Sequence, residues 1–268
     1  MILRYLKLWF SLAKFSLLGE MAFRGNFVVK IVVELLWLGM LLVFNFTIFQ
    51  QTTQIADWKV NEYLFFIGCY FTMGGLMEML FLDNCNQFSD LVRTGDLDFF
   101  LLKPIDEQFL VSCKHIDWSC APNILLGLGV MGYAFWLGEW ELDFFKAVLL
   151  VVLFISGMGL AYGFMLLLMS ASIWMMRNQS LFEMWWLFTT LMRYPREIFK
   201  GRFAEPTQLF FSFVVPIMLV TNVPARVMVK GLESSWLPWY AIGSALVVLG
   251  VSRWVFRAAL QRYRSAGS

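Results

Sequence analysis

The sequence is poor in the residues that most often build metal and redox sites. It contains one histidine, His115, which excludes a metal site made of several histidines. Its four cysteines form no CxxC pair, so we interpret them as ordinary buried thiols rather than as a disulfide or a metal site. They are Cys69, Cys85, Cys113 and Cys120. The sequence therefore predicts no bound metal ion.

Motifs of nucleotide binding and of hydrolysis are also missing. The chain has no GxxxxGK[ST] segment, so it does not hold ATP in a P-loop of its own. It has no GxSxG or HExxH segment either. Residues 127–132 match GxGxxG formally, but they lie inside an apolar segment, where small residues favour close helix packing instead. We expect a protein that is not an enzyme and binds no cofactor itself.

Charge is scarce as well. Charged residues make up 15% of the chain and hydrophobic residues 60%. A soluble domain carries about 25% charged and about 45–50% apolar residues. Here the apolar residues are gathered in runs of about 20, the length that crosses a bilayer core as a helix. The composition predicts an all-α, polytopic membrane protein, and the net charge of +2 gives no reason to expect nucleic acid binding.

Five apolar runs have the composition of membrane spans. They cover residues 27–49, 62–82, 116–137, 144–169 (or on to 174) and 237–256. Basic residues precede the first run and follow the last, so both termini are expected on the cytoplasmic side. The number of crossings must then be even. One of the two remaining apolar pieces, residues 181–199 and 209–229, must supply the sixth span.

Two prolines favour one assignment of these pieces. Pro216 and Pro224 interrupt the second piece and suit a broken, re-entrant hairpin over residues 207–231, which needs protein or water around it. We therefore expect a fifth span over residues 181–199 and a hairpin that enters from outside. The reverse assignment stays open, because the first one places the basic segment 193–202 outside, against the usual charge bias.

The first twenty residues have the pattern of an amphipathic helix. Arg4, Lys7, Ser11 and Lys14 recur every three or four residues on one face, and leucine and aromatic residues fill the rest. This pattern is typical of a helix that lies in the headgroup layer. The alternative is a plain entry helix packed on the bundle.

A few charged residues fall within the apolar runs. Lys30 and Glu34 lie four residues apart and can pair on one helix face, which lowers the cost of placing charge there. A contact with a substrate is the alternative. Glu78 is expected to face protein or water.

Residues 84–106 form the one long polar insert between apolar runs. The insert is too charged to lie in lipid, while residues 99–102 give it an apolar edge. Gly95 allows a turn, and Pro104 ends any helix before it. The insert is therefore predicted to be a short amphipathic element exposed to the cytoplasm, with a surface that a partner can bind.

The residues expected to dock this partner are Arg93, Gly95, Asp96, Asp98, Lys103 and Pro104. The alternative is that Arg93 and the aspartates merely pair with each other at the surface. Such pairs contribute at most about 1 kcal/mol.

Four stretches resemble those of type-2 ABC exporter permeases, most closely a subfamily of uncharacterised permeases of similar length. The insert reads LVRTGDLDFFLLKPID, which looks like the cytoplasmic loop of that family. Arg193-Tyr194-Pro195, the Val215-Pro216 to Asn222-Val223-Pro224-Ala225 segment, and the ending LQRYRSAGS also agree with family motifs. Val223 departs from the family, which often has an aromatic residue there, and Met228-Val229-Lys230 is more basic than usual.

The resemblance implies a single transmembrane permease domain over residues 1–268, with six transmembrane helices. It implies an interfacial helix at residues 1–20, a coupling loop at residues 84–106 and a re-entrant hairpin at residues 207–231. The hairpin would form part of an outer gate with Tyr194, Pro195, Pro216, Asn222 and Pro224. Implied partners are two ABC ATPase subunits, which would bind the ATP and Mg, and a second permease chain, often a related but different protein. The implied location is the bacterial inner membrane.

The leading hypothesis is thus a non-catalytic permease subunit of an ATP-driven exporter. A stand-alone channel or secondary transporter, an intramembrane enzyme and a membrane scaffold are the alternatives. An enzyme would need a cluster of His, Asp, Glu or Cys at membrane depth, which the sequence does not show. The many aromatic residues and methionines suit an apolar cargo, but helix packing needs them equally.

Overall fold

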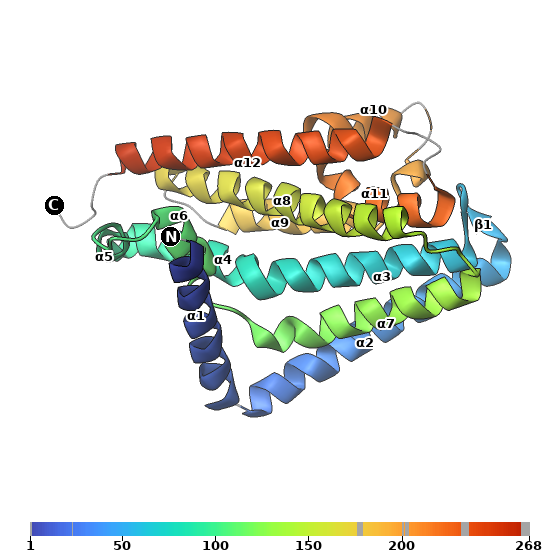
Figure 1. Cartoon of the computed structure of the whole chain (residues 1–268), viewed down its shortest axis with the longest axis horizontal. Helices are drawn as coiled ribbons and strands as arrows, with labels where there is room; N and C mark the ends of the chain where they lie inside the picture. The colour runs from blue at the N-terminus through green and yellow to red at the C-terminus, as the bar shows by residue number, and fades with distance from the viewer. Residues whose placement is uncertain are drawn as a thin grey trace.

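The chain folds into a bundle of long helices that run side by side (Figure 1). The computed structural model describes residues 2–22, 24–175, 179–199, 201, 204–231 and 236–263. Within this part of the chain, five helices are long and apolar enough to cross a membrane, and they coincide with the five predicted runs. The prediction of an all-α membrane protein is confirmed.

The long elements are α1 (Ile2–Ala22), α2 (Arg24–Gln51), α3 (Val60–Met77), α7 (Ala121–Gly138), α8 (Phe144–Met175) and α12 (Trp236–Arg262). The short elements before α8 are β1 (Gln54–Ile55), β2 (Trp58–Lys59), η1 (Glu78–Leu82), α4 (Asp83–Thr94), α5 (Leu97–Leu101), α6 (Glu107–Cys113) and η2 (Trp118–Cys120). Those after α8 are α9 (Gln179–Met192), η3 (Arg196–Ile198), α10 (Glu205–Leu209), η4 (Phe210–Val214), η5 (Pro216–Met218) and α11 (Leu219–Lys230). The two short strands pair antiparallel.

The two ends of the bundle differ in character. At one end, here called the polar end, lie α4, α5, α6 and the last turn of α12 (Figure 1). At the other, the far end, lie the two strands and the chain segments that lead into α8 and α12. Helix α1 belongs to the polar end and is steeply inclined to the long helices. That inclination is what an interfacial helix requires, and its place in the headgroup layer stays a prediction.

Glycines allow α3 and α7 to approach each other closely. A Cβ atom added at Gly127 would meet the Thr72 backbone nitrogen at 2.5 Å and the Gly68 oxygen at 2.9 Å. At Gly129 and Gly132 an added Cβ would meet nothing within 4 Å. Of the three glycines in the formal GxGxxG match, Gly127 therefore has the packing role that the sequence predicted.

The GxxxG step of α8, Gly159 to Gly163, also packs closely. A Cβ added at Gly163 would meet Val248 of α12 at 2.8 Å, and Gly159 faces the same helix. One added at Gly157 would meet the Val220 carbonyl oxygen at 2.8 Å. These glycines let α12 and α11 lie directly on α8.

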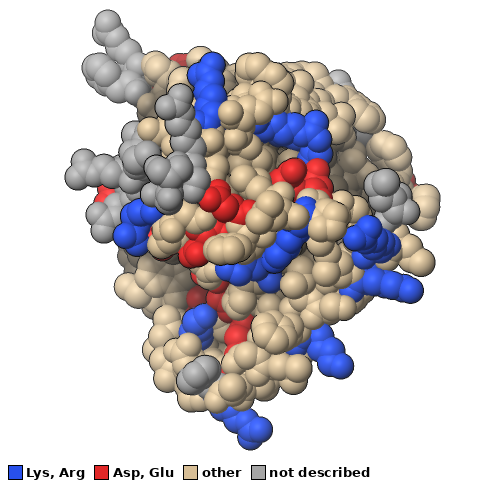
Figure 2. Space-filling view, turned by 90° about the vertical axis from the view of Figure 1, so that its left-hand side faces the viewer, with Lys and Arg blue, Asp and Glu red and all other residues tan. Residues whose placement is uncertain are grey.

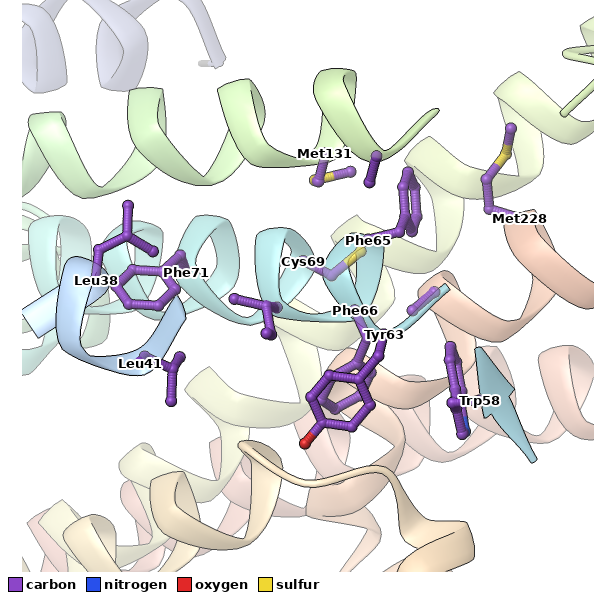
Figure 3. Close-up of a cluster of buried hydrophobic side chains, with 13 residues drawn as sticks. Leu38, Leu41, Trp58, Tyr63, Phe65, Phe66, Cys69, Phe71, Met131 and Met228 are labelled. Atoms are coloured by element: carbon purple, nitrogen blue, oxygen red, sulfur yellow. The ribbon is translucent and has the colours of Figure 1, made fainter. Parts of the chain in front are cut away.

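A cluster of buried aromatic residues and methionines joins β2, α3, α7 and α11 (Figure 3). Trp58 and Phe66 are fully buried, with ring centres 5.6 Å apart in an edge-to-face arrangement. Met131 and Met228 pack into the same cluster. Edge-to-face aromatic pairs are favourable beyond the area that they bury. The far-end half of the bundle is held by this cluster.

The helix does not end where the polar insert begins, so residues 84–94 of the coupling loop that the resemblance implies are helical. The chain stays helical from Val60 to Thr94, a stretch of 35 residues with the π-helical turn η1 inside it. Phe88 and Val92 lie four residues apart on α4 and are both buried. Their apolar face packs against Phe256 of α12 and keeps α4 helical.

Helix α9 runs from the polar end towards the far end (Figure 1). It has 14 residues. At about 1.5 Å per residue it is about 21 Å long, less than the hydrocarbon core of about 30 Å. Then α10 and η4 lead back into the bundle and η5 and α11 lead out again, with a bend of 81° between the two limbs. Among the described residues, this bent pair rather than α9 is the sixth candidate span by length and composition. Which of the two pieces crosses the membrane, and which end faces outside, stays a prediction.

Only one of the two prolines breaks the hairpin. Pro216 begins η5 directly after the bend, as predicted. Pro224 lies inside α11 without ending it, so the predicted second break is wrong. Lys200 and Arg202 of the basic segment and residues 264–268 of the C-terminal motif lie outside the described residues.

Changing Gly127 to Ala should separate α3 from α7, because its Cβ would overlap the Thr72 backbone. Overpacking of this kind costs about 1–3 kcal/mol, so the midpoint of thermal unfolding in detergent should fall. Gly129→Ala is the matched control, with the same change two residues away and open space around it. Equal midpoints for the two variants would contradict the close approach of the helices.

Candidate functional site

The surface predicted for docking lies at the tip of the polar end, where α4 gives way to α5. Arg93 pairs with Asp90 through atoms 3.3 Å apart, and their side chains are 70% and 69% exposed. Gly95 has a φ of 81°, a conformation that glycine adopts readily and that turns the chain between the two helices. Figure 2 shows acidic and basic side chains close together on this face of the molecule.

The remaining predicted docking residues lie along α5. Asp96 accepts a hydrogen bond of 2.7 Å from the Thr94 hydroxyl just before the helix begins. The Lys103 Nζ lies 4.9 Å from the centre of the Phe100 ring, and Pro104 follows it past the end of the helix. We call residues 90–104 the docking surface. The structure brings the predicted residues together there, and their role in docking stays a prediction.

An apolar layer fixes the docking surface to the bundle. Leu97 of α5 is fully buried in one cluster with Phe88 of α4 and Phe256 of α12. Asp98 lies beside Tyr263, just past the end of α12. The docking surface is therefore a packed part of the structure rather than a free loop.

Asp106 joins three helices at the base of this surface. Its carboxylate pairs with Arg253 of α12 at 2.7 Å and caps α6 by accepting a hydrogen bond from the Phe109 backbone. Its backbone nitrogen donates to the Tyr5 hydroxyl of α1. Burial raises the pKa of Asp106, but the bonds from Arg253 and Phe109 outweigh it, so its pKa lies below the usual value. The carboxylate stays charged at neutral pH.

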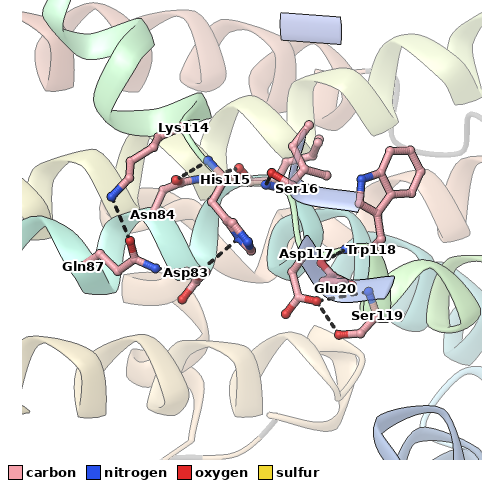
Figure 4. Close-up of polar contacts among 12 residues, drawn as sticks. Ser16, Glu20, Asp83, Asn84, Gln87, Lys114, His115, Asp117, Trp118 and Ser119 are labelled. Carbon is pink, nitrogen blue, oxygen red and sulfur yellow. Dashed lines mark hydrogen bonds and ion pairs between the residues drawn. The ribbon is translucent and has the colours of Figure 1, made fainter. Parts of the chain in front are cut away.

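Residues 115–119 are here called the connector. On one side the connector contacts η1 and α4 (Figure 4). The Asn84 side chain exchanges two hydrogen bonds with the His115 backbone, of 2.7 and 2.9 Å. The His115 ring lies 3.1 Å from the Asp83 carboxylate. The Asp117 nitrogen donates to the Met79 carbonyl oxygen at 2.9 Å. The connector is thereby attached to η1 and α4.

On its other flank the connector binds α1 (Figure 4). The Ile116 nitrogen donates to the Ser16 hydroxyl at 3.2 Å, and the Trp118 nitrogen donates to the Glu20 carboxylate at 2.7 Å. The Trp118 ring nitrogen donates to the Ala13 carbonyl oxygen. Burial raises the pKa of Glu20 above its usual value. The connector and Asp106, the last residue of the polar insert, are thus both bound to α1.

The predicted pair between Lys30 and Glu34 is wrong. Lys30 instead reaches Asp117 of the connector, with a distance of 3.0 Å between the charged atoms, and donates to the Ser119 hydroxyl. Burial raises the pKa of Asp117, but hydrogen bonds from Ser119 and Lys30 outweigh it and lower the pKa below the usual value. Lys30 thus has two partners in the connector, the Asp117 carboxylate and the Ser119 hydroxyl, in place of one carboxylate on its own helix face. The connector lies 87 residues from Lys30, so no local pattern predicts it.

One buried carboxylate holds the hairpin at the far end. Glu197 is 4% exposed and accepts hydrogen bonds from the Trp58 ring nitrogen at 3.1 Å and from the Asn222 amide at 3.0 Å. Arg226 of α11 and Arg196 also pair with it. The sequence analysis missed Glu197, because partners up to 139 residues away give no local signal.

The residues predicted for a gate lie around this carboxylate or on the hairpin itself. Asn222 binds Glu197 directly, as described above. Tyr194 and Pro195 immediately precede η3, the short helix that carries Glu197. Pro216 lies at the bend and Pro224 inside α11. A gating role for these residues stays a prediction.

A groove of about 710 Å³ opens between α2, α3 and α9. Its polar lining includes Glu34, Glu78, Asn123 and Arg193. The aromatic rings of Trp37, Tyr70 and Trp186 line it as well. Glu78 thus faces a cavity, in agreement with the expectation that it faces protein or water. In the described residues, no group of three or more His, Cys, Asp or Glu side chains could hold a metal ion.

A protein-family model described as "ABC-2 family transporter protein" matches residues 35–267 of the chain. The match includes the docking surface, the connector, the hairpin and most of the groove. No curated protein and no solved structure matches the chain.

Changing Glu197 to Gln should loosen the hairpin, because Arg226 and Arg196 would lose their charged partner. Loss of one member of a buried pair costs about 3 kcal/mol. We expect a lower unfolding midpoint in detergent and faster proteolysis within residues 193–231. The matched control is Glu205→Gln at the exposed start of α10, which should change neither. Equal protease resistance of both variants would contradict the role of Glu197.

Proposed function

Because the chain belongs to the ABC-2 transporter family, we propose that it forms half of an export pathway and is driven by ABC ATPase subunits through the docking surface. As a family member it is a multi-pass membrane permease component of an ABC transporter. The ATPase contact and the direction of transport are our proposal. A chain without a P-loop needs a partner that binds the ATP and Mg, and it binds no cofactor itself.

The observation that carries this proposal is the continuity of α3, η1 and α4. One helix of 35 residues leads from the far end to the docking surface. A displacement of Arg93 by an ATPase is therefore passed to the spans without crossing a flexible loop. A stand-alone channel would not need an exposed, charged tip fixed rigidly to a spanning helix.

The same proposal gives the chain its orientation and its partners. The polar end, with both termini, faces the cytoplasm of a bacterial cell, and the far end faces outside. Two ATPase subunits serve two permease chains, and the second permease is a related but different protein. The hairpin between α10 and α11 lies at the outer end of the pathway as a gate. The groove between α2, α3 and α9 lines one half of the pathway, and the second chain closes it.

Co-purification tests the partnership. Expressed with its native genetic neighbours and extracted in mild detergent, the chain should retain a P-loop ATPase in stoichiometric amount. Arg93→Glu combined with Asp96→Arg should lower ATP-driven transport by about tenfold or more without lowering the unfolding midpoint. The control is the double reversal Glu141→Lys with Lys146→Glu at the far end. A chain that purifies alone and carries flux without ATP would instead be a stand-alone transporter.

Thiol labelling in whole cells tests the orientation. Leu102 is 81% exposed on the docking surface, and Glu141 is exposed in the connection before α8. A membrane-impermeant maleimide should label Glu141→Cys in intact cells and Leu102→Cys only after the cells are opened. The parent chain with its four native cysteines gives the background. The opposite labelling pattern would overturn the proposed orientation.

A further inference from the structure

The charged side chains that line the groove include more carboxylates than basic groups. Glu34 of α2 and Glu78 at the start of η1 contribute two carboxylates, and Arg193 contributes one guanidinium. Within the described part of the chain, neither carboxylate forms an ion pair. The nearby Lys30 is already bound to Asp117. Glu78 has a side-chain hydrogen bond with Asn123 but no opposite charge beside it. A carboxylate at membrane depth without an ion-pair partner is unfavourable, so these two groups favour a positively charged occupant.

Arg193 is the one basic side chain among the described residues that line the groove, and it is already in contact with aromatic rings of the protein. The Arg193 guanidinium lies 5.5 Å from the Trp37 ring centre and 5.9 Å from that of Tyr194. Contacts of this kind stabilise a cation over an aromatic face. They leave Glu34 and Glu78 without an ion pair, and they show that Trp37 of the lining accepts a cation over its ring.

A second, independent feature points to a ligand. Asn123 is 5% exposed and lines the groove next to Glu78. Its side-chain oxygen is buried without a hydrogen-bond partner. A buried acceptor without a donor is costly, so a site that holds one is completed by an N–H or O–H group from an occupant.

We infer that the groove binds an amphipathic organic cation, a protonated amine with an apolar body, as the cargo of the transporter. The amine lies between Glu34 and Glu78 and donates to the Asn123 oxygen. The apolar body lies against Trp37, Tyr70 and Trp186. That the cation is the cargo rests on the proposed function, whereas the binding site itself depends only on the groove.

The test uses the full chain in lipid nanodiscs and two fluorescent probes. Monodansylcadaverine is a protonated amine at neutral pH, and its N-acetyl derivative has the same ring and chain without the charge. Fluorescence anisotropy should show saturable binding of the amine and about tenfold weaker binding of the acetylated probe. Glu34→Gln and Glu78→Gln should each weaken amine binding about tenfold and leave binding of the acetylated probe unchanged.

Glu183→Gln is the matched control, since Glu183 is an exposed carboxylate on α9 that does not line the groove. It should bind the amine like the parent chain. If Glu78→Gln lowers the unfolding midpoint, Glu34→Gln at the edge of the groove carries the test alone. Equal binding of the two probes, or unchanged amine binding by Glu34→Gln, would overturn the site.

The result of the probe-binding test can be distinguished from the result of the co-purification test. Amine binding by a chain that retains no ATPase would support the site and refute the ATP-driven exporter. A retained ATPase without amine binding would refute the site and leave the exporter standing.

Discussion

The position of the bent hairpin depends on one buried carboxylate. A charged group buried in a membrane protein needs protein partners, because lipid offers none. Glu197 has such partners, since it joins the strand that carries Trp58, the link before α10 and the Asn222 and Arg226 side chains of α11. With α11 held in this way, it lies directly on the Gly157 face of α8.

The polar end is also held by ion pairs of carboxylates, here on the two sides of α6. Asp117 and Asp106 lie at the two sides of α6, and each pairs with a basic residue of a long helix. Both also lie beside hydrogen bonds to α1, so this helix is fixed at two places, once to the polar insert and once to the connector. Between the polar end and the far end the helices meet through glycines and apolar side chains. The molecule therefore has rigid junctions at its ends and close apolar packing between them.

Features set by local composition could be predicted from the sequence, and features set by distant partners could not. Five spans follow from apolar runs, and the close contact at Gly127 follows from small residues in one of them. The helical nature of α4 could have been inferred from Phe88 and Val92, which lie four apart within polar residues, although the resemblance implied a loop. Lys30 had an acid one turn away and bound Asp117 instead. Glu197 had no local pattern at all, because its role arises from three separate segments.

The groove and the docking surface meet at a single residue. Glu78 lines the groove and is the first residue of η1, the π-helical turn that leads into α4. Turns of this kind recur at functional sites, where the wider hydrogen-bond spacing reorients side chains. One helical turn earlier, an added Cβ at Gly75 would meet that of Asn123 at 3.0 Å, so α7 follows any movement of α3. Because α4 continues η1 without a break, a partner that shifts α4 also shifts Glu78, and Asn123 with it, relative to Glu34. The proposed contact with the partner and the proposed contact with the cargo are then two properties of one helix.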